Sequence, residues 1–295
     1  MAKSRFEYVR NYELPDPLTP NTFIIVRLDG KGFHKFSDAH NFAKPNDKRA
    51  LDLMDTAAKT VFDEYKDVVM AFGESDEYSF LLRRATRVYN RRRSKINTSI
   101  VSLFTSAYVF NWPYFFPDVP LRYPPSFDGR VILYPGEIEI RDYFSWRQAD
   151  THINNLYNTT FWALVHSGQT TAEANKTLQG TNSKDKNELL FSQFSINYNN
   201  LPEMFRKGSV LVRQAQQPSV LASSKPQTVQ QEGSNENHPV EIASQGPKSS
   251  EIITTGHEKC LRKEKTYVGT EGRVVVLHED IVGDAFWKER PWLLL

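Results

Sequence analysis

The sequence has only one cysteine, Cys260, among its 295 residues. A single thiol cannot form an internal disulfide, and structural zinc sites need several cysteines or histidines, so a disulfide framework and a cysteine-based zinc site are both excluded. A lone cysteine is also typical of proteins from reducing compartments. We therefore expect a cytoplasmic or nuclear protein.

We expect neither a secretory signal nor a membrane span. Lys3, Arg5 and Arg10 are not followed by an apolar core, as they would be in a signal peptide. Residues 96–117 carry no charge, but they include seven Ser, Thr or Asn residues and two prolines. This content favours a buried helix of a globular protein, and we expect no membrane contact.

Neither sign of charge is in excess, since 37 Lys and Arg face 35 Asp and Glu and the net charge is +2. The total hides a local segregation, because residues 83–95 carry seven basic residues and no acid, which leaves the rest of the chain net acidic. Hydrophobic residues at 39% and aromatic residues at 13% are enough for a core, so we expect a globular chain of one large or two modest domains.

Apolar periodicity predicts strands and helices in a definite order. Short β-branched runs between turn residues indicate strands, and apolar residues three and four apart indicate helices. The predicted elements are a strand at 23–28, a helix at 50–65, strands at 68–72 and 78–82, a helix from about residue 89, and a strand at 131–134. This order is typical of an α+β, ferredoxin-like antiparallel sheet, which polymerase palms and RNA-recognition domains share.

The second half of the chain changes in composition. We expect a helix at 138–165, a helical stretch at 172–194, and strands at 209–213 and 272–277. Residues 214–256 contain no aromatic residue and are rich in Ser and Gln, which predicts a disordered insertion. The predicted parts are a palm-type catalytic domain at 1–136, a helical and strand extension at 137–213, the insertion at 214–256, and a C-terminal segment at 257–295 that docks back on the body.

Asp29 stands where a predicted strand ends, and Gly30 and Gly32 follow it. A carboxylate at a strand end can face a metal ion, while glycines let backbone amides approach a phosphate. An ordinary Asp-Gly turn would have the same sequence. Asp29 alone leaves both interpretations open.

Three acids, Glu74, Asp76 and Glu77, lie within four residues at the tip of a predicted hairpin. Because their charges repel one another, we expect a cation among them, and Mg²⁺ is the obvious candidate; a solvated acidic turn is the alternative. If the first strand lies beside the hairpin, Asp29 comes near Asp76. The pair could then bridge two metal ions roughly 3.5–4 Å apart, an arrangement used in nucleotidyl transfer.

The basic run at 83–95 leaves this acidic hairpin directly. We expect it to hold a triphosphate or an RNA backbone, with a solvated helix end as the alternative. Lys44 and Asp47, between the first strand and the first helix, could close over the same phosphates. His152, Asn155 and Asn158 recur every three residues within an apolar helical pattern, so we expect them on one face, where they contact a substrate or are hydrogen-bonded within the protein.

Seven segments together resemble the eukaryotic, fungal-type tRNA-histidine guanylyltransferase family. They are RLDGKGFHKFS, HNFAKPND, GESDEYSF, RRRSK, DTHINNLYNTTFW, INYNNLPEMFRKGS and LHEDIVGDAFWKERP. The resemblance runs from residue 1 to about residue 213 and resumes near residue 272. It implies a polymerase palm with helical additions that works in the reverse, 3′-to-5′ direction and adds one guanosine to the 5′ end of tRNA for histidine.

The resemblance also implies roles for individual residues. Asp29, Asp76 and the carbonyl of Gly30 match the ligands of two Mg²⁺ ions, and Glu77 matches an essential catalytic acid. Further matches are nucleotide contacts at Arg27, Lys31, Gly32, Phe33, His34, Lys44, Asp47, Ser75, Arg92 and Lys95, and tRNA activation or contact at His152, Asn158, Lys186 and Asn197.

The implied reaction uses ATP to adenylylate the tRNA 5′-phosphate, then the 3′-hydroxyl of GTP as the nucleophile, and finally removes pyrophosphate. The resemblance also implies a homotetramer, and the aromatic tail at 286–292 would suit an interface. From the residues alone two other activities stay open. One is a palm-type nucleotide cyclase, and the other is a non-catalytic RNA-binding module of ferredoxin-like topology.

Overall fold

The computed structural model describes residues 4–215 and 266–295. Cys260 and all but the first two residues of the polar segment 214–256 lie outside the described residues.

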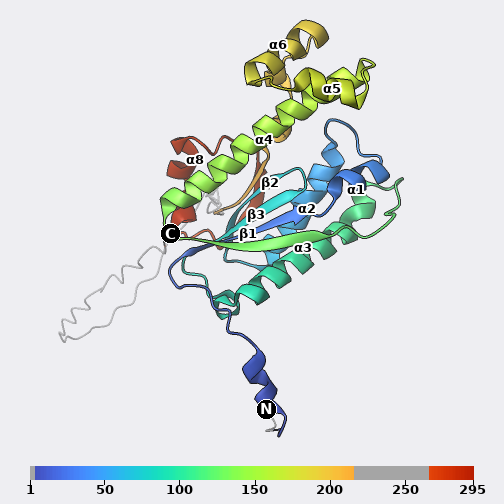
Figure 1. Ribbon diagram of the computed structural model, residues 1–295. Helices are drawn as coiled ribbons and strands as arrows, with labels where there is room; N and C mark the ends of the chain where they lie inside the picture. The colour runs from blue at the N-terminus through green and yellow to red at the C-terminus, as the bar shows by residue number, and fades with distance from the viewer. Residues whose placement is uncertain (1–3, 216–265) are drawn as a thin grey trace, which may run out of the picture. The chain divides into compact units, whose positions relative to one another are not determined.

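A six-stranded antiparallel sheet forms the centre of the described chain (Figure 1). Its order is β4-β1-β3-β2-β5-β6, in which β5 and β6 extend a four-stranded ferredoxin-like core. The strands are β1 at Phe23–Gly30, β2 at Val68–Glu74, β3 at Glu77–Leu82, β4 at Phe127–Tyr134, β5 at Ser209–Gln214 and β6 at Arg273–Leu277. Each predicted strand is present, and the α+β fold class is confirmed.

Helices cover both faces of this sheet, with α2 and α3 on one face and α4 on the other (Figure 1). The α-helices are α1 at Phe33–Ala39, α2 at Lys48–Glu64, α3 at Arg93–Phe115, α4 at Glu137–His166, α5 at Thr171–Leu178, α6 at Ser183–Phe194, α7 at Glu203–Lys207 and α8 at Asp284–Glu289. The 3₁₀ helices are η1 at Glu7–Tyr12, η2 at Val88–Arg91, η3 at Tyr198–Asn200 and η4 at Pro291–Leu294.

The side chains of β1 show why both faces are apolar. Ile24 and Val26 belong to the core with α2 and α3, whereas Phe23 and Ile25 belong to the core with α4. All four are completely buried. A strand covered on both faces needs apolar residues at consecutive positions, which is the continuous run seen in the sequence.

The long helix α4 passes over the tip of the β2–β3 hairpin. Its first half packs on the sheet through Ile140 and Phe144, together with the buried Trp287 of α8. Its second half extends beyond the sheet and packs against α5 and α6 through Leu156 and Leu164 (Figure 1). One helix therefore connects the sheet to the helical part of the chain.

The observed α3 begins later than predicted. It begins at Arg93 and not near Tyr89, because Tyr89 and Asn90 have positive φ angles that a right-handed helix cannot contain. It continues through Pro113 to its end, where a proline removes only one hydrogen bond of the last turn. Within residues 4–215 and 266–295, no helix has both the length and the apolar character to cross a membrane.

The helical stretch predicted at 172–194 is two helices. Gly180 has a φ of 78°, which ends α5, and Asn182 begins α6 as its N-cap by accepting hydrogen bonds from the backbone amides of Lys184 and Asp185. The break lets α5 and α6 pack separately on α4.

Candidate active site

Asp29 and Asp76 lie together at one edge of the sheet, where β1 ends and the hairpin turns. Asp29 is in register with Glu77, and the amide of Gly30 donates a hydrogen bond to the carbonyl of Asp76 at 3.1 Å. A Cβ on Gly30 would lie 2.8 Å from Oδ2 of Asp76 and closer still to the ring of Phe33. The missing side chain thus permits the turn to approach the end of β1.

Burial and neighbouring carboxylates change the acidity of Asp76. Burial is the larger cause, and the charges of Asp29 and Glu74 add to it, so that the pKa of Asp76 rises from 3.8 to about 6. None of the ion pairs within the described residues includes Asp29 or Asp76. Two neighbouring carboxylates without a cation, one of them the half-buried Asp76, form a suitable place for a bound metal ion.

The donor atoms at this edge fit Mg²⁺. This ion prefers oxygen ligands, usually one or two carboxylates, and completes its shell with water and substrate phosphates. Among the described residues, no group of three or more His, Cys, Asp or Glu side chains could hold a metal ion. An ion at Asp29 and Asp76 would therefore take its remaining ligands from the backbone, water and substrate.

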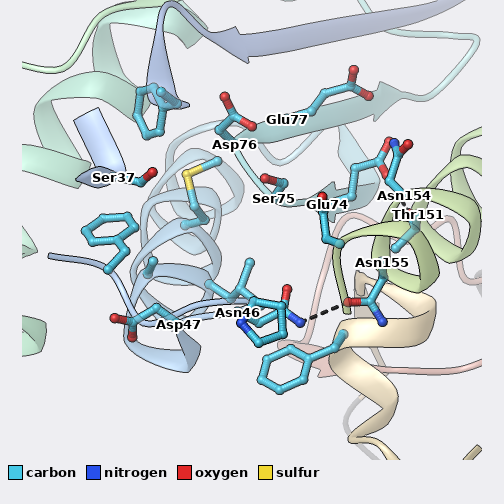
Figure 2. Close-up of a pocket in the computed structure, with 18 of the residues that line it drawn as sticks. Ser37, Asn46, Asp47, Glu74, Ser75, Asp76, Glu77, Thr151, Asn154 and Asn155 are labelled. Carbon is cyan, nitrogen blue, oxygen red and sulfur yellow. Dashed lines mark hydrogen bonds between the residues drawn. The ribbon is translucent and has the colours of Figure 1, made fainter. Parts of the chain in front are cut away.

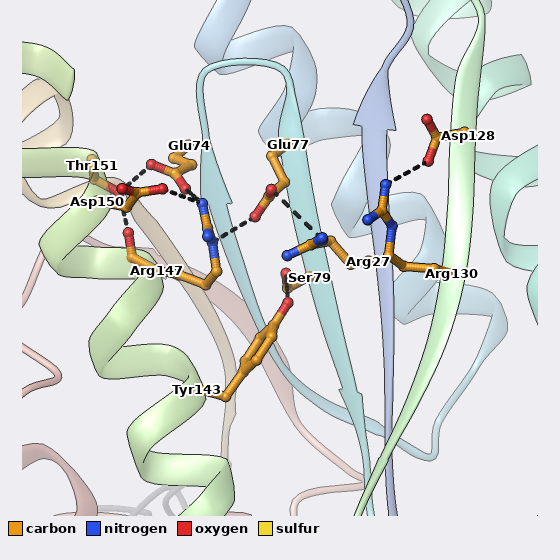
Figure 3. A network of polar contacts seen from close by, with 10 residues as sticks. All are labelled: Arg27, Glu74, Glu77, Ser79, Asp128, Arg130, Tyr143, Arg147, Asp150 and Thr151. Atoms are coloured by element: carbon orange, nitrogen blue, oxygen red, sulfur yellow. Dashed lines mark hydrogen bonds and ion pairs between the residues drawn. The ribbon is translucent and has the colours of Figure 1, made fainter.

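The cation beside the other two hairpin acids is a guanidinium (Figure 3). Arg147 of α4 places Nη2 2.5 Å from Oε1 of Glu74 and Nε 2.8 Å from Oε1 of Glu77. Thr151 donates a hydrogen bond to Glu74 at 2.7 Å, and Arg27 lies 3.7 Å from Glu77. The expectation that Mg²⁺ compensates all three acids is therefore wrong for Glu74 and Glu77, because α4 supplies an arginine to them.

Glu77 is a weaker acid in this environment than a glutamate in water. Burial raises its pKa to about 7, repulsion from Glu74 adds to the rise, and the charges of Arg147 and Arg27 oppose it. Its carboxylate belongs to the network under α4. The implied role of Glu77 as an essential acid stays a prediction.

Arg147 and Glu74 are absent from the predicted site residues, although the sequence held a signal for Arg147. Ile140 and Phe144 are core residues of α4, and Arg147 follows at the same helical spacing with only 5% of its surface exposed. A charged residue in line with core positions predicts a buried partner of opposite charge.

A cavity of about 740 Å³ lies beside the carboxylates (Figure 2). The lining next to Asp76 includes the almost completely buried rings of Phe33 and Tyr108, and the α4 part of the lining includes Asn155 and Asn158. The volume falls in the range of pockets that hold small-molecule ligands, roughly 300–1,000 Å³. Two chemically different walls thus border one space.

Half of the predicted site residues line this cavity. They are Asp29, Phe33, His34, Lys44, Asp47, Ser75, Asp76, Glu77 and Asn158. Gly30 lies next to the cavity through its contact with Asp76, whereas Arg27, Lys31, Gly32, Arg92, Lys95, His152, Lys186 and Asn197 do not line it.

Lys44 and Asp47 shape the loop that enters the cavity. The ammonium of Lys44 lies 2.9 Å from Oδ1 of Asp38 and 3.0 Å from Oγ of Ser37. Asp47 is the N-cap of α2 and accepts hydrogen bonds from the backbone amide and guanidinium of Arg49. Burial would raise the pKa of Asp47, but the bonds from Arg49 outweigh burial and lower it. Asp47 therefore stabilises the loop as a charged cap.

Arg91 and Arg92 of the basic run lie near the start of β1, whereas Asp29 lies at the end of that strand. Arg92 pairs with Asp16 at 3.5 Å, and the neighbouring Arg91 donates to the carbonyl of Thr22, just before β1 begins. The six residue steps along β1 to Asp29 span about 20 Å. β3 carries the chain away from the acidic turn before the run begins, so sequence proximity to the hairpin does not place the run beside Asp76. The expectation that the run holds a triphosphate or an RNA backbone stays a prediction.

The predicted polar face of α4 is divided. Asn155 and Asn158 line the cavity, whereas the ring of His152 lies 5.2 Å from the ring of Tyr198, centroid to centroid. Each step of three residues falls about 60° short of a full turn, so His152 and Asn158 point about 120° apart. Burial, with a smaller contribution from Arg206, lowers the pKa of His152.

The two other predicted tRNA contacts form local hydrogen bonds. Lys186 donates to the carbonyl of Thr181 at 2.8 Å, and Asn197 caps η3 by accepting from the amide of Asn199. Neither lines the cavity, and their implied roles stay predictions.

A ferredoxin-like antiparallel sheet, with two acids at the ends of adjacent elements beside a cavity, is the arrangement expected of a palm-type nucleotidyltransferase. Matches to two family models identify the family within this class. The model described as tRNAHis guanylyltransferase matches residues 6–135, and the model described as Thg1 C terminal domain matches residues 138–283. The chain belongs to the tRNAHis guanylyltransferase family, which confirms the resemblance found in its sequence.

Individual relatives agree with this assignment. The chain is 50% identical to the probable tRNA(His) guanylyltransferase of Mus musculus over 295 residues, which cover 100% of this chain and 89% of the mouse protein. The crystal structure of tRNA(His) guanylyltransferase from Saccharomyces cerevisiae is similar at a TM-score of 0.69 and 52% identity, covering 72% of this chain and 94% of the yeast chain. A bacterial tRNA(His) guanylyltransferase-like protein in complex with ATP is similar at a TM-score of 0.59 and 26% identity, covering 70% and 86%.

Proposed function

We propose that this chain adds one guanosine to the 5′ end of tRNA for histidine by 3′-to-5′ nucleotidyl transfer. Family membership across the length of the chain supports the reaction. The observation within the site that carries it is the pair of Asp29 and Asp76 beside the cavity. The ATP bound to the bacterial relative supports nucleoside triphosphates as the small substrates.

Three transfers at phosphorus make up the proposed reaction. First, an oxygen of the RNA 5′-phosphate attacks the α-phosphorus of ATP, and pyrophosphate leaves. Next, the 3′-hydroxyl oxygen of GTP attacks the activated 5′-phosphorus and loses its proton, and AMP leaves. Water then attacks the α-phosphorus of the new 5′-triphosphate, and pyrophosphate leaves.

The residues around the cavity have distinct parts in these transfers. Asp29 and Asp76, with the carbonyl of Gly30, would hold Mg²⁺. Bound there, Mg²⁺ would lower the pKa of an attacking hydroxyl and neutralise charge on the leaving pyrophosphate. The buried rings of Phe33 and Tyr108 would keep water from the side of the cavity next to Asp76.

The direct test is extension of a 5′-phosphorylated histidine tRNA transcript with ATP, GTP and Mg²⁺. We expect an RNA one nucleotide longer at its 5′ end, and no extension when ATP or GTP is omitted. A folded chain that does not extend this RNA would overturn the proposal. A nucleotide product formed without RNA would indicate a cyclase, and RNA binding with no product at any Mg²⁺ concentration would indicate a binding module.

Assembly and location also belong to the proposal. A homotetramer is supported by large apolar side chains that lie open to solvent, such as Tyr12 at 79%, Leu14 at 87% and Tyr114 at 77% exposed. An interface would remove such side chains from water. Light scattering should give four times the 34.0 kDa of one chain, and a monomeric mass would exclude the tetramer. A cytoplasmic or nuclear location stays a prediction for cell fractionation.

A further inference from the structure

Trp162 is a half-buried tryptophan on the α4 wall of the cavity. Its neighbour Phe161 packs against the buried cluster that contains Leu164 and Ala174, but Trp162 belongs to no buried cluster of the described residues. Phe161 meets Trp162 edge-on, with ring planes at 87°. A large ring that lines a cavity without joining the core is available to a ligand.

Two polar groups accompany this ring. The ammonium of Lys44 lies 5.7 Å from the centroid of the Trp162 ring, and Lys44 is itself held by Asp38. Asn158 stands four residues earlier on α4, on the same face of the helix, and is exposed toward the cavity. An indole face, an amide and a cation together suit an unpaired nucleobase and its phosphate, since bases stack on aromatic rings and amides bind their edges.

The position of Trp162 separates it from the reacting carboxylates. Thr151 contacts Glu74 of the hairpin, and Trp162 follows eleven residues later, about 16 Å further along the helix axis. Phe33 and Tyr108 line the cavity beside Asp76, where the proposed reaction places the triphosphate. A reaction that joins a triphosphate to an RNA needs room for both, and the α4 wall around Trp162 is a part of the cavity distant from Asp76 where the RNA could lie.

We infer that Trp162 stacks an unpaired nucleobase at the end of the RNA substrate, with Asn158 at the edge of the base and Lys44 near a phosphate. The inference rests on the proposed function, because it places the second substrate of that reaction. It assigns the acidic end of the cavity to the triphosphate and the aromatic end to the RNA.

The test measures binding without chemistry. Fluorescence anisotropy in EDTA gives the Kd of a 5′-phosphorylated histidine tRNA for the wild type, Trp162→Phe and Trp162→Leu, and equilibrium dialysis gives the Kd of GTP and ATP. We expect Trp162→Leu to raise the Kd of the RNA roughly tenfold or more, Trp162→Phe to raise it much less, and both variants to keep the Kd of the triphosphates. Phe191→Leu is the matched control, because Phe191 of α6 is 64% exposed and does not line the cavity.

A modified RNA makes the test specific to a base. When the terminal nucleotides of the RNA are abasic, the difference between the wild type and Trp162→Leu should disappear, as in a double-mutant cycle. The inference would be overturned if Trp162→Leu left the Kd of the RNA unchanged, or if it raised the Kd of GTP or ATP and not that of the RNA. The proposed function would still stand in either case if the wild type extends the RNA. If Trp162→Leu does not fold by circular dichroism, Trp162→Gln replaces it under the same criteria.

Discussion

Nε of Arg147 lies 2.8 Å from the carboxylate of Glu77, the residue that follows Asp76 in the hairpin. The same guanidinium pairs with Glu74 at 2.5 Å, so one buried side chain of α4 holds the acids on both sides of the turn. Asp76 is left without a cation, beside Asp29. The chain thus neutralises the structural acids itself and leaves the pair that fits a metal ion.

Replacing Arg147 by alanine should destabilise the fold strongly. Glu74 would then be buried without a cation and Glu77 would keep only Arg27 at 3.7 Å, and breaking a buried ion pair lowers the free energy of unfolding by about 3–5 kcal/mol. Urea denaturation at pH 8 measures this change. Arg141→Ala, which breaks an exposed pair with Asp284, should have a far smaller effect.

A second variant isolates the cause. Arg147→Met combined with Glu74→Gln and Glu77→Gln removes the charge of all three residues and should recover part of the lost stability. A loss for Arg147→Ala no larger than that for Arg141→Ala would show that the network does not stabilise the hairpin.

The raised pKa of Asp76 predicts how stability depends on pH without metal. The folded protein holds this proton up to about pH 6, whereas the unfolded chain releases it near 3.8, so the folded state binds more protons between these values. The free energy of unfolding should therefore fall as pH rises from about 4 to about 6, by at most about 3 kcal/mol from this group. Asp76→Asn should flatten this decline in urea denaturation at a series of pH values in EDTA. An equally steep decline in Asp76→Asn would contradict the assignment of the shift.

Mg²⁺ should reverse the destabilisation at higher pH. Binding to the folded state alone raises its stability, and the ion needs ionised carboxylates, so the thermal midpoint should rise with Mg²⁺ at pH 8 and not at pH 5. In Asp76→Asn the midpoint should not respond to Mg²⁺, and guanosine addition should fall by at least about 100-fold. A folded Asp76→Asn variant with substantial Mg²⁺-dependent activity would remove Asp76 from the site.

Most of the fold follows from local patterns in the sequence. Consecutive apolar residues mark the strand at 23–28, and apolar residues three and four apart mark the helix at 50–65. Both patterns involve only residues that are close together in the sequence. The proximity of Asp29 and Asp76 follows from the antiparallel order that those elements favour. Local sequence patterns are therefore enough to predict that Asp29 and Asp76 lie close together.

The contact of Arg147 with Glu74 is a different case, because 73 residues separate the two positions. The placement of α4 over the hairpin depends on the packing of Ile140 and Phe144 with Trp287 of the C-terminal helix. The position of Arg92 misled for a related reason. Arg92 follows the acidic turn closely in sequence, but the whole of β3 lies between them. The distance in space between Arg92 and Asp76 therefore depends on the direction of β3.

The place of Arg92 and Lys95 leads to a prediction about the assembly. In one chain Arg92 stands at the start of α3, paired with Asp16 and next to the residues that precede β1, away from Asp29 at the other end of that strand, yet the family resemblance implies triphosphate contacts for Arg92 and Lys95. If both statements hold, the contacts come from a second copy of the chain. Mixing an inactive Asp76→Asn chain with an inactive double variant, Arg92→Ala with Lys95→Ala, should then restore part of the guanosine addition, because mixed assemblies contain an intact acidic pair facing an intact basic pair.

The measurement is the extension rate of each variant alone and after the two are mixed, unfolded and refolded together. The control is a chain that carries both Asp76→Asn and Arg87→Ala, because Arg87 is an exposed residue of the same basic run with no implied contact. This chain should be inactive alone. When it is mixed with the Arg92 and Lys95 double variant, guanosine addition should still be restored in part. Mixing that restores no activity, in samples that light scattering shows to contain mixed assemblies, would place the basic residues outside the partner's site. The salt dependence of triphosphate binding tests the same two contacts independently. The Arg92 and Lys95 double variant should bind the triphosphate more weakly than the wild type, and the difference should be largest at low salt, where charges are least screened.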